Sequence, residues 1–177
     1  MRAAVLVGVV ALLSAGCSPT PHHSGSPSLG VGMQVFPVSE RTPAPGLSGT
    51  TITGASFDLA DAAGHGLVAV NIWASWCGPC RKEMPVLVHA AGRSLHVVGI
   101  DERDSARSAQ RFATSLGASY PSLTDPQGKL LARLRMLPQT GVPSTVFLDR
   151  EGRVAARVIG PVDSHVLARI LRQLGAS

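Results

Sequence analysis

The chain has 177 residues, of which 45% are hydrophobic and 15% are charged. This length suits one globular domain of about 130 to 150 residues with an appendage, and the hydrophobic content excludes a disordered or collagen-like protein. Only 4% of the residues are aromatic, which argues against a base-stacking platform. The net charge of +5 comes from 16 basic and 11 acidic residues. The basic residues are scattered singly, so we expect no nucleic-acid partner.

The N-terminus predicts export from the cytoplasm. Residues 1–16 begin with Met and Arg2, continue through an apolar stretch and end in small residues, which is the pattern of a signal peptide. The apolar stretch is too short to cross about 30 Å of hydrocarbon as a retained helix. With Cys17 next, the segment resembles the lipobox of bacterial lipoproteins, although Ser14 stands where that motif usually has Leu. The resemblance implies that Cys17 is lipidated and holds the protein at the outer face of the cytoplasmic membrane.

Residues 17–46 are predicted to form a flexible linker. They are rich in Ser, Pro, Gly and Thr, and such a composition cannot bury enough apolar surface to become ordered. A tether of this kind would let a domain move above the membrane that holds Cys17. His22 and His23 have no further ligands beside them, so we expect no metal site there.

From residue 47 to residue 177 the pattern predicts an α/β domain. Alternating apolar residues indicate an N-terminal hairpin of two short strands, around residues 50–52 and 57–59. The run 67–74 is continuously apolar, as expected of a central strand covered on both faces. Then follow a helix from the cysteines to about residue 91, a strand at 95–100, a helix at 105–116, a loop at 121–126, a helix at 127–134, strands at 145–148 and 154–159, and a helix at 164–174. This order predicts a central mixed β-sheet flanked by helices on both faces.

Two cysteines, Cys77 and Cys80, stand where the central strand, a tight turn and a helix meet. A structural zinc site would need two further ligands at matching spacing, and no second pair exists, so no metal is expected. A purely structural disulfide that closes so short a loop would gain little from loop entropy. It would also not need to lie at a helix N-terminus. The pair is therefore interpreted as redox-active.

The position of the pair assigns a role to each cysteine. A thiol at the first turn of a helix faces unpaired backbone N–H groups and the positive end of the helix dipole, and both favour the thiolate. Cys77 is then the nucleophile. Cys80, one turn further on, attacks the mixed disulfide and releases the substrate. Gly78 and Pro79 let the turn tighten and the helix begin.

The run WCGPC after a buried strand, together with a Val-Pro pair before a later strand, resembles the thioredoxin superfamily over residues 47–177. The resemblance implies a thioredoxin-like fold and thiol-disulfide oxidoreductase activity without a cofactor. It also implies that Pro143 follows a cis peptide bond and lies against the dithiol. The main chain of Val142 would then pair with an extended substrate segment as an added strand. Trp76 would line the substrate approach, while Trp73 is expected in the core.

Other details resemble the exported, membrane-tethered TlpA and ResA group of that superfamily. Cytosolic thioredoxins have a buried Asp six residues before the first Cys, and Asn71 stands there instead. The run CRKEMP at residues 80–85 resembles the group's Cys-Glu-Pro pattern, which implies that Glu83 tunes the dithiol. The alternative for Glu83 is a solvated carboxylate that the helix dipole favours. The 66 residues from Cys77 to Pro143 imply a helix–strand insertion before the cis-Pro.

The group resemblance implies an extracytoplasmic reductant of protein disulfides, for example in apocytochrome c. Its electron donor would be a membrane thiol relay of the CcdA/DsbD type, and the protein would act as a monomer. Two alternatives stay open, an exported oxidant of the same fold and a non-catalytic module that binds a partner in the groove beside Trp76 and Pro143. The Gly-Pro dipeptide between the cysteines is that of reducing thioredoxins. A peroxidase is disfavoured, because WCGPC lacks the Thr that precedes peroxidatic cysteines by two or three residues.

Overall fold

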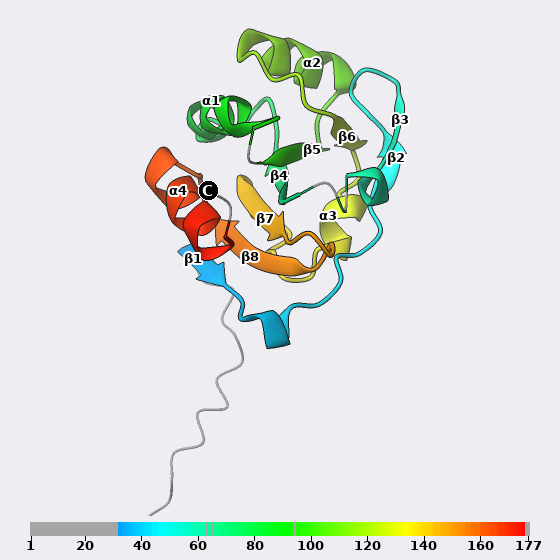
Figure 1. Cartoon of the computed structure of the whole chain (residues 1–177). Helices are drawn as coiled ribbons and strands as arrows, with labels where there is room; N and C mark the ends of the chain where they lie inside the picture. The colour runs from blue at the N-terminus through cyan, green and yellow to red at the C-terminus, as the bar shows by residue number, and fades with distance from the viewer. Residues whose placement is uncertain (1–31, 63, 65, 94, 176–177) are drawn as a thin grey trace, which may run out of the picture.

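The apolar run at residues 67–74 forms the central strand β4, Val68–Trp73, in which every residue is buried. The computed structural model describes residues 32–62, 64, 66–93 and 95–175. Within them β4 belongs to a six-stranded mixed sheet (Figure 1). Its strands, in hydrogen-bonded order, are β1 (Gly32–Val35), β8 (Val154–Ile159), β7 (Ser144–Leu148), β4, β5 (His96–Glu102) and β6 (Ser122–Asp125). The pairs β4·β5 and β5·β6 are parallel, whereas β7 is antiparallel to both of its neighbours.

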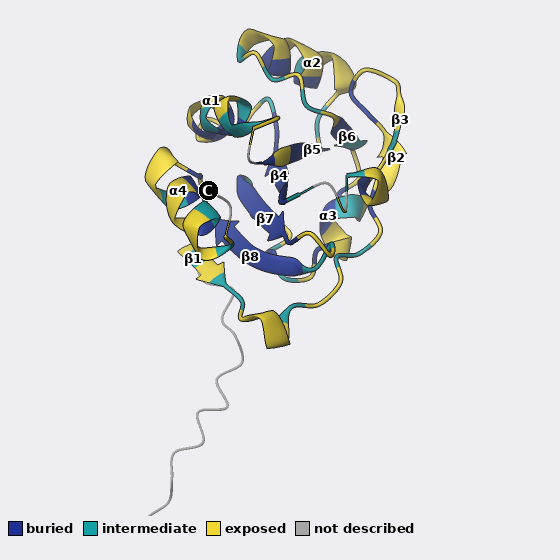
Figure 2. Ribbon diagram, in the orientation of Figure 1, coloured by how far each residue is buried: buried dark blue, intermediate teal, exposed yellow. Residues whose placement is uncertain are grey.

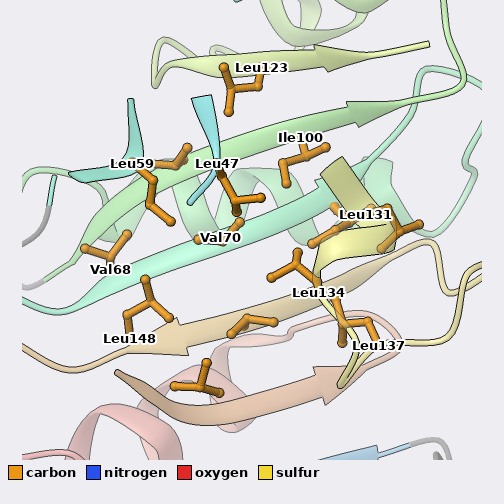
Figure 3. Close-up of a cluster of buried hydrophobic side chains, with 14 of the residues drawn as sticks. Leu47, Leu59, Val68, Val70, Ile100, Leu123, Leu131, Leu134, Leu137 and Leu148 are labelled. Carbon is orange, nitrogen blue, oxygen red and sulfur yellow. The ribbon is translucent and has the colours of Figure 1, made fainter. Parts of the chain in front are cut away.

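Helices cover both faces of this sheet, as the sequence predicts. They are α1 (Cys80–Ala90), α2 (Ala106–Ser115), α3 (Lys129–Arg133) and α4 (Ser164–Gln173). Side chains alternate along a strand, so β4 contributes to two separate clusters. Val70 shares a core cluster with Leu131 of α3 (Figure 3). Ala69, next to it in the strand, shares another with Leu87 of α1 and Ile170 of α4.

The predicted N-terminal hairpin is present and lies along one edge of the sheet. Its strands are β2 (Ser48–Thr50) and β3 (Ser56–Asp58), which pair antiparallel. Short 3₁₀ helices precede and follow it, η1 (Val38–Glu40) and η2 (Leu59–Asp61). The N–H of Ile52 donates to the Ser122 carbonyl at 2.8 Å. The hairpin segment therefore covers part of the outer edge of β6.

The loop predicted at residues 121–126 contains a strand instead. Residues 122–125 form β6, which pairs in parallel with β5, so the prediction of a loop is wrong there. Two flanking prolines and only four residues leave too little pattern for a period of two to be recognised. The strand is stabilised by its pairing with β5 and by the burial of Leu123. With α2, it forms the helix–strand insertion that the spacing from Cys77 to Pro143 implies.

Residues 32–46, which the composition assigns to a flexible linker, pack against the domain. Strand β1 pairs antiparallel with β8. Further along, Arg41 forms an ion pair with Asp149 at 3.3 Å, and the N–H of Ala44 donates to the Gly152 carbonyl at 3.0 Å. Apolar side chains of the segment also pack against the core, Met33, Val35, Phe36 and Ala44. So few apolar residues among prolines and polar residues are not recognisable from the sequence as part of the domain. The signal peptide, Cys17 and the two linker histidines lie outside the described residues.

Burial is concentrated in the middle of the sheet (Figure 2). Strands β4, β7 and β8 are buried throughout, while β2 is exposed at every residue. In the part of the chain that the structure describes, no helix has the length and apolar character needed to cross a membrane. The active-site segment connects the carboxyl end of β4 to the start of α1, so it lies at one end of this buried centre.

Candidate active site

The two cysteines lie at the junction between β4 and α1. They form a disulfide in which the Cα atoms are 5.4 Å apart. Cys77 is only 4% exposed and Cys80 is fully buried. The N–H of Cys80, the first residue of α1, donates to Sγ of Cys77 at 3.2 Å. Because this N–H belongs to the unpaired first turn of a helix, it can stabilise a thiolate on Cys77 in the reduced protein.

The Val142–Pro143 peptide bond is cis, as the family resemblance implies. Pro143 precedes β7, whose first residue Ser144 pairs with Ile72 near the end of β4. Val142 packs against the cluster that contains Cys77 and Cys80, so this loop lies beside the disulfide. The N–H of Val142 donates to the Thr140 carbonyl at 3.0 Å. A substrate strand that used this N–H would first have to displace that bond.

Three of the predicted substrate-binding residues form an accessible rim around Cys77. Gly78 and Pro79 are exposed. Trp76 is 59% exposed, which is unusual for so large an apolar side chain. Its indole N–H donates to the Arg103 carbonyl at 3.3 Å, so the ring is held in one orientation although it faces solvent. Trp73, by contrast, is fully buried and stacks on Phe112 with ring centroids 5.7 Å apart, which confirms its place in the core.

Glu83 is a buried carboxyl group in α1, one turn beyond Cys80, and is only 1% exposed. Asn71 Nδ2 donates to Oε1 of Glu83 at 2.9 Å, and the N–H of Val162 donates to Oε2 at 3.0 Å. The same amide of Asn71 also reaches Thr145 Oγ1 at 3.1 Å. Burial raises the pKa of Glu83 to about 7, although both hydrogen bonds oppose the shift. The alternative of a solvated carboxylate is therefore wrong, and Glu83 is a group that titrates near neutral pH.

Sequence reasoning missed a second buried carboxyl group, Asp101. It pairs with Trp73 across β4 and β5 and is fully buried. Neither carboxyl oxygen has a hydrogen-bond partner among the described residues. Burial, and then the nearby charges of Asp104, Glu102 and Asp125, raise the pKa of Asp101 to about 8. The available signal was an Asp directly after the apolar run at residues 97–100, where the predicted strand ends although β5 continues to Glu102.

The segment after β5 also fixes the active-site loop, a role that the sequence did not reveal. Oδ2 of Asp104 accepts the N–H of Ser75 at 2.7 Å. Arg103, which binds the Trp76 indole through its carbonyl, has a positive φ of 50°, a conformation that non-glycine residues adopt rarely. The two residues before Cys77 are thus both tied to residues 103–104.

Among residues 32–62, 64, 66–93 and 95–175, no group of three or more His, Cys, Asp or Glu side chains could hold a metal ion. The described residues bring together the two cysteines, the buried Glu83 one helical turn beyond Cys80, and an exposed rim of Trp76, Gly78 and Pro79.

Comparison with known proteins places this geometry in a family. The AhpC/TSA family matches residues 41–157, which is more than half of the chain. The chain belongs to the AhpC/TSA family. Together with the fold and the paired cysteines, this membership confirms the prediction of a TlpA/ResA-like thiol-disulfide oxidoreductase in the thioredoxin superfamily.

Similar proteins support the same assignment. The thiol:disulfide interchange protein HelX of Rhodobacter capsulatus is 34% identical over 116 residues, which cover 65% of this chain and 64% of HelX. The thiol-disulfide oxidoreductase ResA of Bacillus subtilis is 27% identical over 134 residues, 73% of either chain. The crystal structure of a DsbF homologue from Corynebacterium diphtheriae has a TM-score of 0.75 and 33% identity, and the match covers 86% of this chain and 97% of that one.

The raised pKa of Asp101 predicts a pH-dependent stability difference for Asp101→Asn. The folded protein holds a proton on Asp101 up to about pH 8, whereas the unfolded chain releases it near pH 4. The carboxyl group therefore destabilises the fold progressively as pH rises from about 4 to 8. We expect Asp101→Asn to match the parent chain at pH 4 and to be more stable by about 5 kcal/mol at pH 8, because each unit of difference between the two pKa values corresponds to about 1.4 kcal/mol.

Urea unfolding at several pH values measures this difference. The matched control is Asp61→Asn, because Asp61 is exposed. The stability of Asp101→Asn relative to Asp61→Asn should therefore rise with pH. A pH-independent difference for Asp101→Asn would show that Asp101 is ionised throughout this range.

Proposed function

We propose that this protein reduces disulfide bonds of exported proteins with the Cys77–Cys80 dithiol, with apocytochrome c as the leading substrate. The observation that carries the proposal is the placement of the pair at the N-terminus of α1, next to the cis Val142–Pro143 bond. The predicted signal peptide supports a role outside the cytoplasm. The reducing direction is favoured by the Gly-Pro dipeptide between the cysteines and by the TlpA/ResA-like pattern.

The reaction begins when the Cys77 thiolate attacks one sulfur of the substrate disulfide. A bond forms between Cys77 and that sulfur, the substrate S–S bond breaks, and the other substrate sulfur leaves and takes up a proton. Cys80 then attacks Sγ of Cys77, which releases the second substrate thiol. Two electrons pass to the substrate, and the Cys77–Cys80 disulfide of the present structure is the oxidised product.

Substrate binding is proposed to involve the exposed rim of Trp76, Gly78 and Pro79, with Val142 and Pro143 opposite. The substrate would lie extended along residue 142, in the mode of an added strand. Among the described residues no backbone N–H donates to the Val142 carbonyl, which can therefore accept a hydrogen bond from the substrate, whereas the Val142 N–H must first release the Thr140 carbonyl. Trp76 presents a rigid apolar surface, because its indole N–H is already bound.

Glu83 is proposed to receive the proton that Cys80 must lose before the second step. It lies one helical turn beyond Cys80 and is excluded from water. With a pKa of about 7, its carboxyl group can both accept and return a proton at neutral pH. Glu83 would thus serve as the proton acceptor in place of the Asp that thioredoxins have at the position of Asn71.

The remaining elements of the proposal concern location and electron supply. Cys17, as a lipidated residue, would hold a monomeric domain at the outer face of the cytoplasmic membrane. A membrane thiol relay of the CcdA/DsbD type would then return two electrons to the Cys77–Cys80 disulfide after each turnover. The open alternative is an oxidant of the same fold, which would run the same exchange in reverse.

The equilibrium reduction potential of the Cys77–Cys80 pair decides between these directions. The full chain with Cys17→Ser leaves one dithiol to titrate against dithiothreitol or glutathione. We expect a value near or below roughly −250 mV, because a reductant must lie close to thioredoxin. A value of roughly −120 to −150 mV would assign the protein to the disulfide-forming oxidants instead.

Cys80→Ser should trap substrate proteins as mixed disulfides on Cys77. The variant can perform the first attack, but it lacks the thiol that resolves the intermediate. Non-reducing electrophoresis of exported proteins, followed by reduction, would display the trapped partners. Cys77→Ser is the control and should trap none. If Cys77→Ser retained the biological role of the parent, the protein would be a binding module.

Glu83→Gln should slow the resolving step at neutral pH by about 100-fold, the lower range of general-base effects. In the parent chain the rate of mixed-disulfide resolution should rise with pH through about 7, as Glu83 loses its proton. In Glu83→Gln this rise around pH 7 should be absent. Stopped-flow measurement with a small disulfide gives both rates.

Asn71→Asp in the Glu83→Gln background restores a carboxyl group at the thioredoxin position and should recover part of the rate. If Glu83→Gln kept the pH profile of the parent chain, Glu83 would have only a structural role.

A further inference from the structure

A surface pocket of about 330 Å³ is formed by the active-site loop, the first turn of α1 and α2. It is lined by Ser75, Arg81, Ser108, Arg111, Phe112 and Ser115. Ser75 is two residues before Cys77, and Arg81 directly follows Cys80. Phe112 shares a core cluster with both cysteines. The pocket is therefore lined by residues that flank or pack with the reactive pair, although it contains none of the predicted substrate-binding residues.

Arg81 is held in this pocket by an aromatic ring. Its guanidinium carbon lies 4.8 Å from the centroid of Phe112, a cation–π contact. Such a contact uses the face of the guanidinium and leaves its N–H edges for other acceptors. Among the described residues, Arg81 has no ion pair with a carboxylate.

Arg111 contributes a second guanidinium to the same pocket. Its Nη2 donates to Oγ of Ser108 at 3.4 Å, and within the described ranges it too has no carboxylate partner. Asp104 binds backbone rather than these arginines, because its two oxygens accept the N–H groups of Ser75 and Ser105, each at 2.7 Å. The pocket thus combines two cations with serine hydroxyls and has no acidic side chain in its lining.

We propose that this pocket binds a carboxylate side chain of the protein substrate, an Asp or Glu within a few residues of the disulfide. Two guanidinium groups in one pocket repel each other, and a carboxylate between them relieves this repulsion while it accepts paired N–H···O bonds. The specificity is for disulfides in acidic segments. This inference rests on the proposed function, since it names a feature of that substrate.

The carboxylate takes no part in the electron transfer. It positions the substrate so that its sulfur approaches Cys77, and the bonds that form and break remain those of thiol-disulfide exchange. The second guanidinium, Arg111, comes from α2 of the inserted helix–strand unit. The insertion therefore supplies a substrate contact that the strand β4 and helix α1 do not provide on their own.

Paired disulfide peptides test the proposal. Each carries a fluorophore and a quencher across the disulfide, and members of a pair differ only in Glu or Gln, placed one to three residues on either side of a Cys. The rate constant for reduction by the reduced Cys17→Ser chain is measured under single-turnover conditions. We expect the best Glu peptide to react about three- to tenfold faster than its Gln partner at low salt. In Arg111→Gln, and in Arg81→Gln, this Glu/Gln ratio should approach one.

Arg107→Gln is the matched control, because Arg107 is an exposed residue of the same helix that does not line the pocket. Its Glu/Gln ratio should stay at the parent value. Equal rates for every Glu and Gln pair would overturn the proposal and leave the proposed function intact. An equal loss in Arg107→Gln and Arg111→Gln would also overturn it, by indicating general charge steering. No reduction of any peptide would instead overturn the proposed function, and this proposal with it.

Discussion

The complete burial of β4 is the constraint on which the active site depends. Strands on both sides and helices over both faces hold this strand in place, so the position of its carboxyl end is fixed. Cys77 follows four residues later and α1 begins at Cys80. The rigid strand thereby determines that Sγ of Cys77 meets the unpaired N–H of a helix start. A looser strand would let this geometry vary, and the stabilisation of a thiolate would vary with it.

Polar groups are also buried near the reactive pair, where removing them from water is unfavourable. Asn71 lies in the central strand, and its Nδ2 donates to Glu83 and Thr145, while its buried Oδ1 has no hydrogen-bond partner among the described residues. Glu83 in turn binds the N–H of Val162, between β8 and α4. One carboxyl group therefore links α1 to the strand beneath it and to the segment before the last helix. Burial of such a group is unfavourable for its charged form, which is also why it can exchange protons near pH 7.

The inserted α2 and β6 change the surroundings of the dithiol without changing the dithiol itself. The segment before α2 anchors the two residues that precede Cys77, through Asp104 and the carbonyl of Arg103. The helix adds Phe112 behind the cysteines and Arg111 at the surface. The strand–helix junction places the two cysteines, and the insertion supplies Phe112 and Arg111 next to them in space, so the surroundings of the dithiol are built from different parts of the fold.

The sequence by itself determined the reactive pair, the central strand, the mixed sheet and the family, because WCGPC after a doubly buried strand is a local pattern. It also placed Pro143 and distinguished the buried Trp73 from the exposed Trp76. Tertiary structure alone decided the rest. Strand β6 and residues 32–46 are ordered by pairing with distant strands and by packing on the core, and each is too short for its pattern to be recognised from the sequence. The burial of Glu83 and Asp101 and the meeting of Arg81 with Arg111 depend on which helices pack together. Such neighbours are remote in the chain, so their effect on a pKa or a pocket cannot be read from either segment alone.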